Sequence, residues 1–143
     1  MASGDAGDAM DLEQAMIVAG VGCRAGASAG EIEAAIAAAL DRAGLANEAL
    51  ALIAIAQAKA SEPGIAAAAS ARGAKLVVVP QAALEAAGAR TVTRSERVAA
   101  LTGVPSLSEA AALAAGGPSA RLLAPRVAVG PVTCALAVSG GEP

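Results

Sequence analysis

The stretch V-A-G-V-G-C-R-A-G-A-S-A-G-E, residues 18–31, decides the fold of this 143-residue chain. An apolar run of strand length leads into a glycine-rich turn, and the turn leads into a helix. Glycines let such a turn bend sharply and approach a bound group closely. Ser28 and Glu31 have the spacing of a capping box, which predicts that a helix begins here. A strand, a tight turn and a helix N-terminus in this order indicate an α/β protein that can receive a ligand above the turn.

The rest of the chain continues the alternation of strands and helices. The expected elements are strands over 15–21, 49–56 and 75–79, helices over 28–43, 61–71 and 80–87, a small edge strand over 91–93, helical turns over 95–101, a helix over 106–115, and two tightly joined antiparallel strands over 121–129 and 132–138. This order predicts one α/β domain over residues 15–143, with a mainly parallel sheet covered on both faces and a mixed edge at its C-terminal end. Residues 1–14 are expected to form a disordered tail.

Several local signals refine these elements. Ser61 is expected to cap the third helical segment, with Pro63 in its first turn. The continuous apolar run over 75–79 is typical of a strand buried on both faces. Ser106 and Glu109 have the spacing of a second capping box.

The composition excludes several classes of function. The chain has no Phe, Tyr, Trp or His, so it cannot stack nucleobases on aromatic rings or use an imidazole in catalysis. Four of the 13 acidic residues lie within the first 13 residues, so the remainder is nearly neutral against 10 basic residues. We therefore expect no nucleic-acid partner, no membrane partner, no metal and no cofactor. Two cysteines and no signal peptide favour a cytoplasmic location.

Charged residues follow the first two predicted strands. Arg24 lies beside the glycine turn, where a guanidinium suits a carboxylate or phosphate. Lys59 and Glu62 follow the second strand, and loops after neighbouring parallel strands emerge at one edge of a sheet. We expect these three residues to share a crevice, with Glu62 either orienting Lys59 or acting as a catalytic acid/base. Arg94 and Arg97 can form a second anion-binding site, or their side chains can simply be exposed to solvent.

Two other interpretations of the glycine turn stay open. A dinucleotide fingerprint is disfavoured, because the spacing is G-x-G-x-x-x-G and no acid ends the second strand. The second interpretation is that the glycines of the turn are needed only for packing. Cys23 beside Arg24 can be an activated nucleophile, but without a base it is better explained as a small turn residue. Cys134 is expected to lie in the core.

Four motifs in chain order carry a resemblance to a known family. They are V-G-V-G-C-R-A-G-A-S, I-A-I-A-Q-A-K-A-S-E-P-G-I, S-E-R-V and G-V-P-S-L-S-E-A-A-A-L. Together they resemble the cobalamin-biosynthesis family of CobE and the C-terminal domain of CbiG, over residues 16–138. The resemblance implies a three-layer α/β/α domain acting in corrin-ring synthesis on a precorrin-type tetrapyrrole. CbiG opens a lactone and releases acetaldehyde, whereas CobE stands alone, and this chain is expected to be of the stand-alone kind.

The resemblance also implies which residues form the site. The residues expected to bind the precorrin, with Glu62 as the candidate catalytic group, are Gly20, Gly22, Cys23, Arg24, Gly26, Ser28, Lys59, Ser95, Ser106 and Glu109. Ala25 and Ile55 depart from the family, which often has Arg and Thr there, and this lowers the expectation of catalysis. The expected function is a carrier or a lactone-opening hydrolase or lyase. A nucleotide- or phosphate-binding module, a structural partner of other pathway enzymes and a homodimer remain alternatives.

Overall fold

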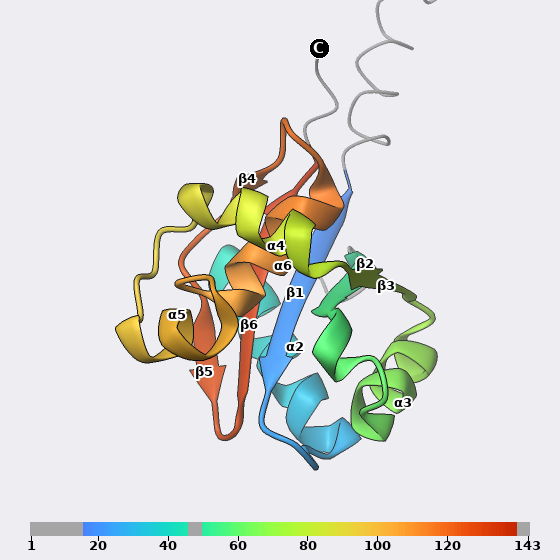
Figure 1. The fold of residues 1–143 in the computed structure, drawn as a ribbon. Coiled ribbons are helices and arrows are strands. Elements are labelled where there is room, and N and C mark those ends of the chain that lie inside the picture. The colour runs from blue at the N-terminus through green and yellow to red at the C-terminus, as the bar shows by residue number, and fades with distance from the viewer. Residues whose placement is uncertain (1–15, 46–49, 140–143) are drawn as a thin grey trace, which may run out of the picture.

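The computed structural model describes residues 16–45 and 50–139, which form a three-layer α/β domain around one sheet (Figure 1). The strands lie in the order β3-β2-β1-β6-β4, and β5 also pairs with β6. Their bounds are β1 (Ile17–Cys23), β2 (Leu50–Ala56), β3 (Lys75–Val79), β4 (Arg121–Leu122), β5 (Val127–Val129) and β6 (Val132–Val138). The expected fold class is confirmed: β1, β2 and β3 are parallel, and the antiparallel strands lie at the C-terminal end of the chain.

Helices cover both faces of the sheet, and each face has its own core. On one face, α2 (Ala29–Ala43) and α3 (Pro63–Arg72) bury isoleucines such as Ile32 and Ile36 against β1 and β2. On the other face, α4 (Gln81–Ala87) and α6 (Leu107–Gly116) form a core that is rich in alanine. The remaining helix, α5 (Glu96–Thr102), has no buried residue and lies at the side of the sheet (Figure 1).

The first helix begins where the sequence predicts. The Glu31 N–H donates to Ser28 Oγ (3.1 Å), and the Ser28 N–H donates to Glu31 Oε1 (2.9 Å), so the capping box is complete. Gly44 ends α2 in the left-handed conformation, with φ 74°. This pair of caps fixes both ends of α2 against the sheet.

Gly20 lies under α6 rather than in a ligand site. A Cβ at Gly20 would overlap the carbonyl oxygen of Ser108 and lie 2.7 Å from the Ala112 nitrogen. The small residues Ala110 to Ala112 of α6 are completely buried at this contact. Gly20 therefore has a packing role, because α6 needs a residue without a side chain on β1, and its predicted binding role stays a prediction.

Some predicted boundaries are wrong. Ser61 does not cap α3, which begins at Pro63 with Glu62 at the N-cap and no side-chain bond. Residues 91–93 form no strand, and β3 is an edge strand in which Val78 is 43% exposed, because nothing pairs beyond it. Residues 121–129 form two short strands instead of one. The expected tail over residues 1–14 lies outside the described residues.

The second capping box does not form. Ser106 is the N-cap residue of α6, but its hydroxyl makes no cap hydrogen bond. The Glu109 carboxylate instead accepts four hydrogen bonds from two other segments of the chain.

Within the described residues, no single helix is long and apolar enough to cross a membrane, and only α5 and α6 together, bent by 64°, have the necessary length and composition.

Candidate functional site

The turn after β1 is held from two sides. The Arg24 N–H donates to the Pro131 carbonyl oxygen (3.0 Å), which ties the turn to the β5–β6 hairpin. The Gly26 N–H donates to Glu62 Oε1 (3.0 Å), which ties the same turn to the segment after β2. Gly26 has φ 83°, a conformation in which a side chain would be strained. The two loops are thus joined directly, and Arg24 and Lys59 line one groove without Glu62, so the expected crevice of all three residues stays a prediction.

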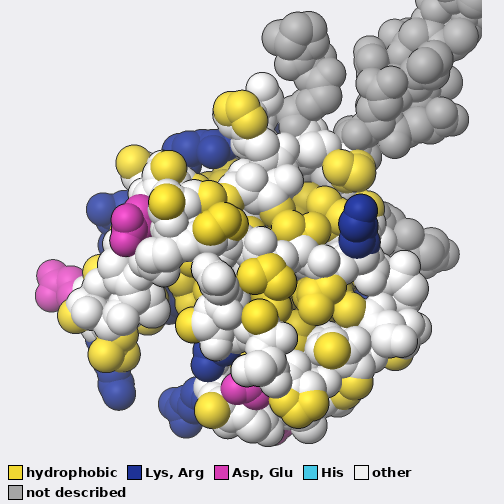
Figure 2. Space-filling model, turned by 45° about the vertical axis from the view of Figure 1, so that its right-hand side comes forward, with side chains coloured by type: hydrophobic (Ala, Val, Ile, Leu, Met, Phe, Trp, Pro, Cys, Tyr) yellow, Lys and Arg dark blue, Asp and Glu magenta, His cyan; other side chains and the backbone are white. Residues whose placement is uncertain are grey.

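A groove with a volume of about 510 Å³ opens beside this turn. This volume falls within the range of roughly 300–1,000 Å³ that small-molecule sites have. Its lining comes from the end of β1, the segment after β2, α5, the first turn of α6, the residue before β5 and the β5–β6 hairpin. In the space-filling view, Lys and Arg side chains border a hollow at the lower left (Figure 2).

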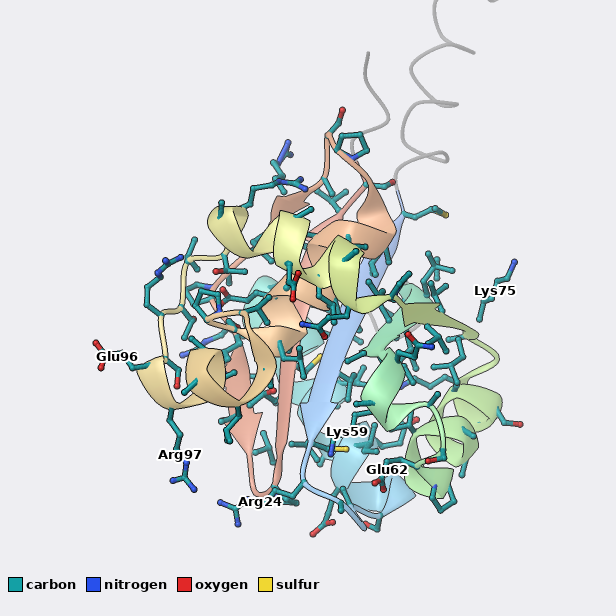
Figure 3. The ribbon with its side chains drawn as sticks, viewed as in Figure 1. Arg24, Lys59, Glu62, Lys75, Glu96 and Arg97 are labelled. Carbon is teal, nitrogen blue, oxygen red and sulfur yellow. The ribbon has the colours of Figure 1, made fainter. Side chains whose placement is uncertain are left out.

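Two walls of the groove carry its charges. We call Arg24 and Lys59 the near wall, because they follow β1 and β2, and Arg97 and Arg126 the far wall, because they come from α5 and the loop before β5. Arg24 and Arg97 extend from the same end of the molecule (Figure 3). Across the described part of the chain, none of these four side chains forms an ion pair, and no carboxylate is among the groove-lining residues. The groove is therefore a site of concentrated positive charge.

The groove also has an apolar surface. Val98 and Leu101 of α5 line it together with Leu107 and Pro131. Leu101 is 76% exposed, so its side chain gives the groove an accessible apolar surface. A ligand that combines a broad apolar face with several anionic groups matches both features.

Cys23 lies in the groove as a half-buried thiol. Burial raises the pKa of Cys23, the nearby Lys59 ammonium lowers it and the Glu62 carboxylate raises it, with a net increase. The thiol is therefore mainly protonated at neutral pH and is a poor nucleophile. Cys134 is fully buried, and burial raises its pKa to about 12, as expected of a core residue.

Glu62 fixes the turn rather than facing the groove alone. One carboxylate oxygen accepts from the Gly26 N–H, and the side chain is half-buried. Glu62 is labelled beside Lys59 in Figure 3, but it is not among the groove-lining residues. A role for Glu62 as acid/base stays a prediction.

Glu109 is completely buried and is not available to a ligand. Its Oε1 accepts from the Val92 and Thr93 N–H groups (both 2.8 Å), and its Oε2 accepts from the Thr93 hydroxyl (2.6 Å) and the Arg126 N–H (2.9 Å). Burial alone raises the pKa of Glu109, but these hydrogen bonds outweigh it and the pKa is lowered. Glu109 is therefore an ionised structural group that is not among the groove-lining residues, and its predicted contact with the ligand stays a prediction.

The other predicted binding residues lie at different distances from the groove. Gly22 lines it, and a Cβ there would lie 3.0 Å from the Thr133 hydroxyl. Ser28 caps α2 and Ser95 caps α5, where its hydroxyl accepts from the Val98 N–H (3.2 Å). Ser106 is completely buried and is not among the groove-lining residues, so its binding role also stays a prediction. The binding roles of Gly22, Ser28 and Ser95 stay predictions.

Sequence reasoning missed Arg126 and left Arg97 undecided. Arg126 lies in no glycine turn or capping pattern and follows no parallel strand, and Arg97 lies in the first turn of α5 after the Ser95 cap, a pattern that does not show where its side chain points. Only the folded chain brings them to the groove, because Glu109 holds the segments on both sides. In the described residues, no group of His, Cys, Asp and Glu side chains can hold a metal ion.

The fold and the groove define a class of protein, an α/β/α domain with a cationic groove at the carboxyl ends of its parallel strands. The model of the family "Cobalamin synthesis G C-terminus" matches residues 17–137. The chain belongs to this family of cobalamin biosynthesis proteins.

Known proteins and structures agree with this assignment. The chain is 36% identical to the protein CobE from Sinorhizobium sp over 121 residues, which cover 85% of this chain and 79% of the relative. A crystal structure of CobE, described as a protein from the cobalamin (vitamin B12) biosynthetic pathway, has a TM-score of 0.79 and 30% identity, covering 87% of this chain and 91% of that one. The cobalamin biosynthesis protein chiG from Agrobacterium tumefaciens has a TM-score of 0.69 and 47% identity, covering 85% and 97%.

Proposed function

We propose that this protein binds a precorrin-type tetrapyrrole of corrin-ring synthesis in the groove and acts as its carrier. The observation that carries this proposal is the set of four cations on four separate segments, Arg24, Lys59, Arg97 and Arg126, around one groove without a lining carboxylate. A corrin precursor has acetate and propionate groups around its whole ring. Cations that come from different segments can each bind a different carboxylate of such a ligand. A ligand with a single phosphate would use only some of them.

The apolar lining supports the same ligand. The face of a macrocycle can rest on aliphatic side chains, and Leu101 and Val98 offer such a surface between the charged walls. Its carboxylates can then reach guanidinium groups, which bind carboxylates through paired N–H donors. The absence of aromatic residues is therefore no obstacle to holding the ring.

A carrier role fits the site better than lactone opening. One carboxylate oxygen of Glu62 already accepts a hydrogen bond from the Gly26 N–H. The raised pKa of Cys23 makes its thiol a poor nucleophile for covalent catalysis. The groove also offers no acidic residue for a ribose hydroxyl, which disfavours a nucleotide ligand. Other pathway enzymes as partners, a homodimer and a cytoplasmic location stay predictions.

Copurification tests the proposal. The protein is expressed beside the early enzymes of corrin synthesis and purified, and its absorption spectrum is recorded. We expect a coloured protein with precorrin-type visible absorption. The matched control is the double variant Arg24→Ala/Arg126→Ala, which removes one cation from each wall and is expected to emerge colourless.

Two results would contradict the proposal. One is a colourless wild-type protein under conditions in which the pathway enzymes make pigment. The other is a purine absorption band on the wild-type protein that the double variant loses, since that would assign the groove to a nucleotide.

A further inference from the structure

We infer that Glu109 is a positioning residue for ligand binding, which holds the far wall of the groove at the correct distance from the near wall. The inference rests on the proposed function, because it concerns how the same groove binds its ligand. Glu109 is completely buried in α6 and is not among the groove-lining residues, so it acts only through the residues that it holds.

The first contact of Glu109 places Arg126. The Arg126 N–H donates to Glu109 Oε2 (2.9 Å), while the Arg126 side chain lines the groove. The segment between β4 and β5 has no regular secondary structure. The Glu109 carboxylate therefore fixes the backbone from which one far-wall cation extends.

The second contact places α5 and Arg97. The Val92 and Thr93 N–H groups and the Thr93 hydroxyl donate to the same carboxylate, three residues before Glu96 at the start of α5. No residue of α5 is buried, so packing alone does not fix this helix. Its position depends on the segments that flank it, where Glu109 is the charged anchor, and on the Gln81 amide, which donates to the Thr102 carbonyl oxygen (2.7 Å) at its C-terminal end.

The two contacts share one side chain, which makes the far wall a unit. A single buried carboxylate accepts hydrogen bonds from the segment before α5 and from the segment before β5, so these two segments keep a fixed separation. The near wall has no such dependence, because Arg24 and Lys59 follow strands at the centre of the sheet. Loss of the carboxylate is expected to loosen Arg97 and Arg126 together and to leave Arg24 and Lys59 in place.

A titration with uroporphyrin tests this inference. Uroporphyrin has acetate and propionate groups on every pyrrole ring and is used here as the probe. We expect Glu109→Gln to weaken its binding about tenfold, because an amide cannot accept from all four donors. The matched control is Glu33→Gln, which removes a carboxylate from the ion pair with Arg72 on the other face of the sheet and is expected to leave binding unchanged.

A double-mutant comparison separates positioning from a general loss of structure. In the Arg97→Ala/Arg126→Ala background, the effect of Glu109→Gln on uroporphyrin binding is expected to disappear. In the Arg24→Ala background, it is expected to persist at about tenfold. An effect of equal size in both backgrounds would overturn the inference, since Glu109 would then act on the whole domain.

A second variant and a second measurement keep the test independent of the stability of Glu109→Gln. Thr93→Val removes only the hydroxyl that donates to Glu109 Oε2, and we expect it to weaken binding in the same direction by about threefold. Amide hydrogen exchange in Glu109→Gln is expected to accelerate at Val92, Thr93 and Arg126 and not in β1. Unchanged exchange at these three amides would overturn the inference even if uroporphyrin does not bind, and absence of wild-type binding alone would count against the proposed function only.

Discussion

The two walls of the groove carry the same charges but are built in different ways. The near wall follows β1 and β2, two parallel strands inside the sheet, and its turn is fixed by hydrogen bonds to Pro131 and Glu62. The far wall belongs to a short helix and a loop, and one buried carboxylate accepts hydrogen bonds from the segments before both. The difference teaches that a site can combine a half that follows inner strands of the sheet with a half in which one buried carboxylate joins two irregular segments.

The largest expected effect concerns the strand that carries the near wall. Gly20→Ala should reduce the free energy of unfolding by about 3 kcal/mol, because its Cβ meets the backbone of α6 and backbone cannot move aside cheaply. Urea unfolding measures this change. Gly30→Ala is the control, since its Cβ has only Ser28 Oγ within 4 Å, at 3.9 Å, and the free energy should stay within about 1 kcal/mol of the wild type.

A near-normal stability of Gly20→Ala would contradict the close approach of β1 and α6. It would also return Gly20 to the set of candidate binding residues.

The next effect concerns the anchor of the far wall. Glu109→Gln should reduce the free energy of unfolding at pH 7 by about 1.5–3 kcal/mol, since it removes hydrogen bonds to a charged acceptor. The pKa of Glu109 is lowered in the folded protein. Its stabilisation is therefore present above the pKa of the unfolded chain and is lost as the pH falls through the folded pKa.

Urea unfolding at pH 7 and at several lower values measures this dependence. The difference between wild type and Glu109→Gln should shrink as the pH falls. A difference that stays constant down to the most acidic pH would show that the Glu109 charge does not hold the far wall.

The contribution of the near wall to binding is a prediction of similar size. Arg24→Ala should weaken binding of uroporphyrin by about 1.5–3 kcal/mol, roughly 10- to 150-fold in Kd, without a change in fold. Arg24→Lys should restore only part of the affinity, because an ammonium lacks the paired donors of a guanidinium. An absorbance titration measures both variants, and equal Kd values for Arg24→Ala and wild type would remove Arg24 from the site.

The smallest effect is expected at the thiol between the walls. Cys23→Ala should retain most cobalamin production in a strain that lacks the native gene, because burial raises the pKa of this thiol and no base activates it. Complementation measures the result. Complete loss of production by a folded Cys23→Ala protein would revive covalent chemistry at this position.

The same comparison explains what the sequence could predict. The strand, glycine turn and helix around the near wall were predicted correctly because their signals are local: a capping box, an apolar run and the residues that follow a strand. The rule that neighbouring parallel strands end at one edge also predicted that Arg24 and Lys59 lie together, and both line the groove, whereas Glu62 is not among the lining residues.

The far wall could not be predicted, because its signals are not local. The spacing of Ser106 and Glu109 fits a capping box, yet the carboxylate finds better donors in segments 16 and 17 residues away. The valines of β3 read as a strand buried on both faces, since composition does not tell a central strand from an edge. Gly20 was predicted to bind the ligand because its contact with α6 is also not local: the contacting residues, Ser108 and Ala112, lie far along the chain.

Hydrogen exchange measured with and without uroporphyrin tests the central claim most directly, that both walls hold one polyanionic ligand. We expect the ligand to protect amides in the turn after β1, in α5 and in the β5–β6 hairpin, and to leave β3 and α3 unchanged. Protection confined to β3 and α3, or in the turn after β1 without α5, would contradict the claim that the two walls form one site.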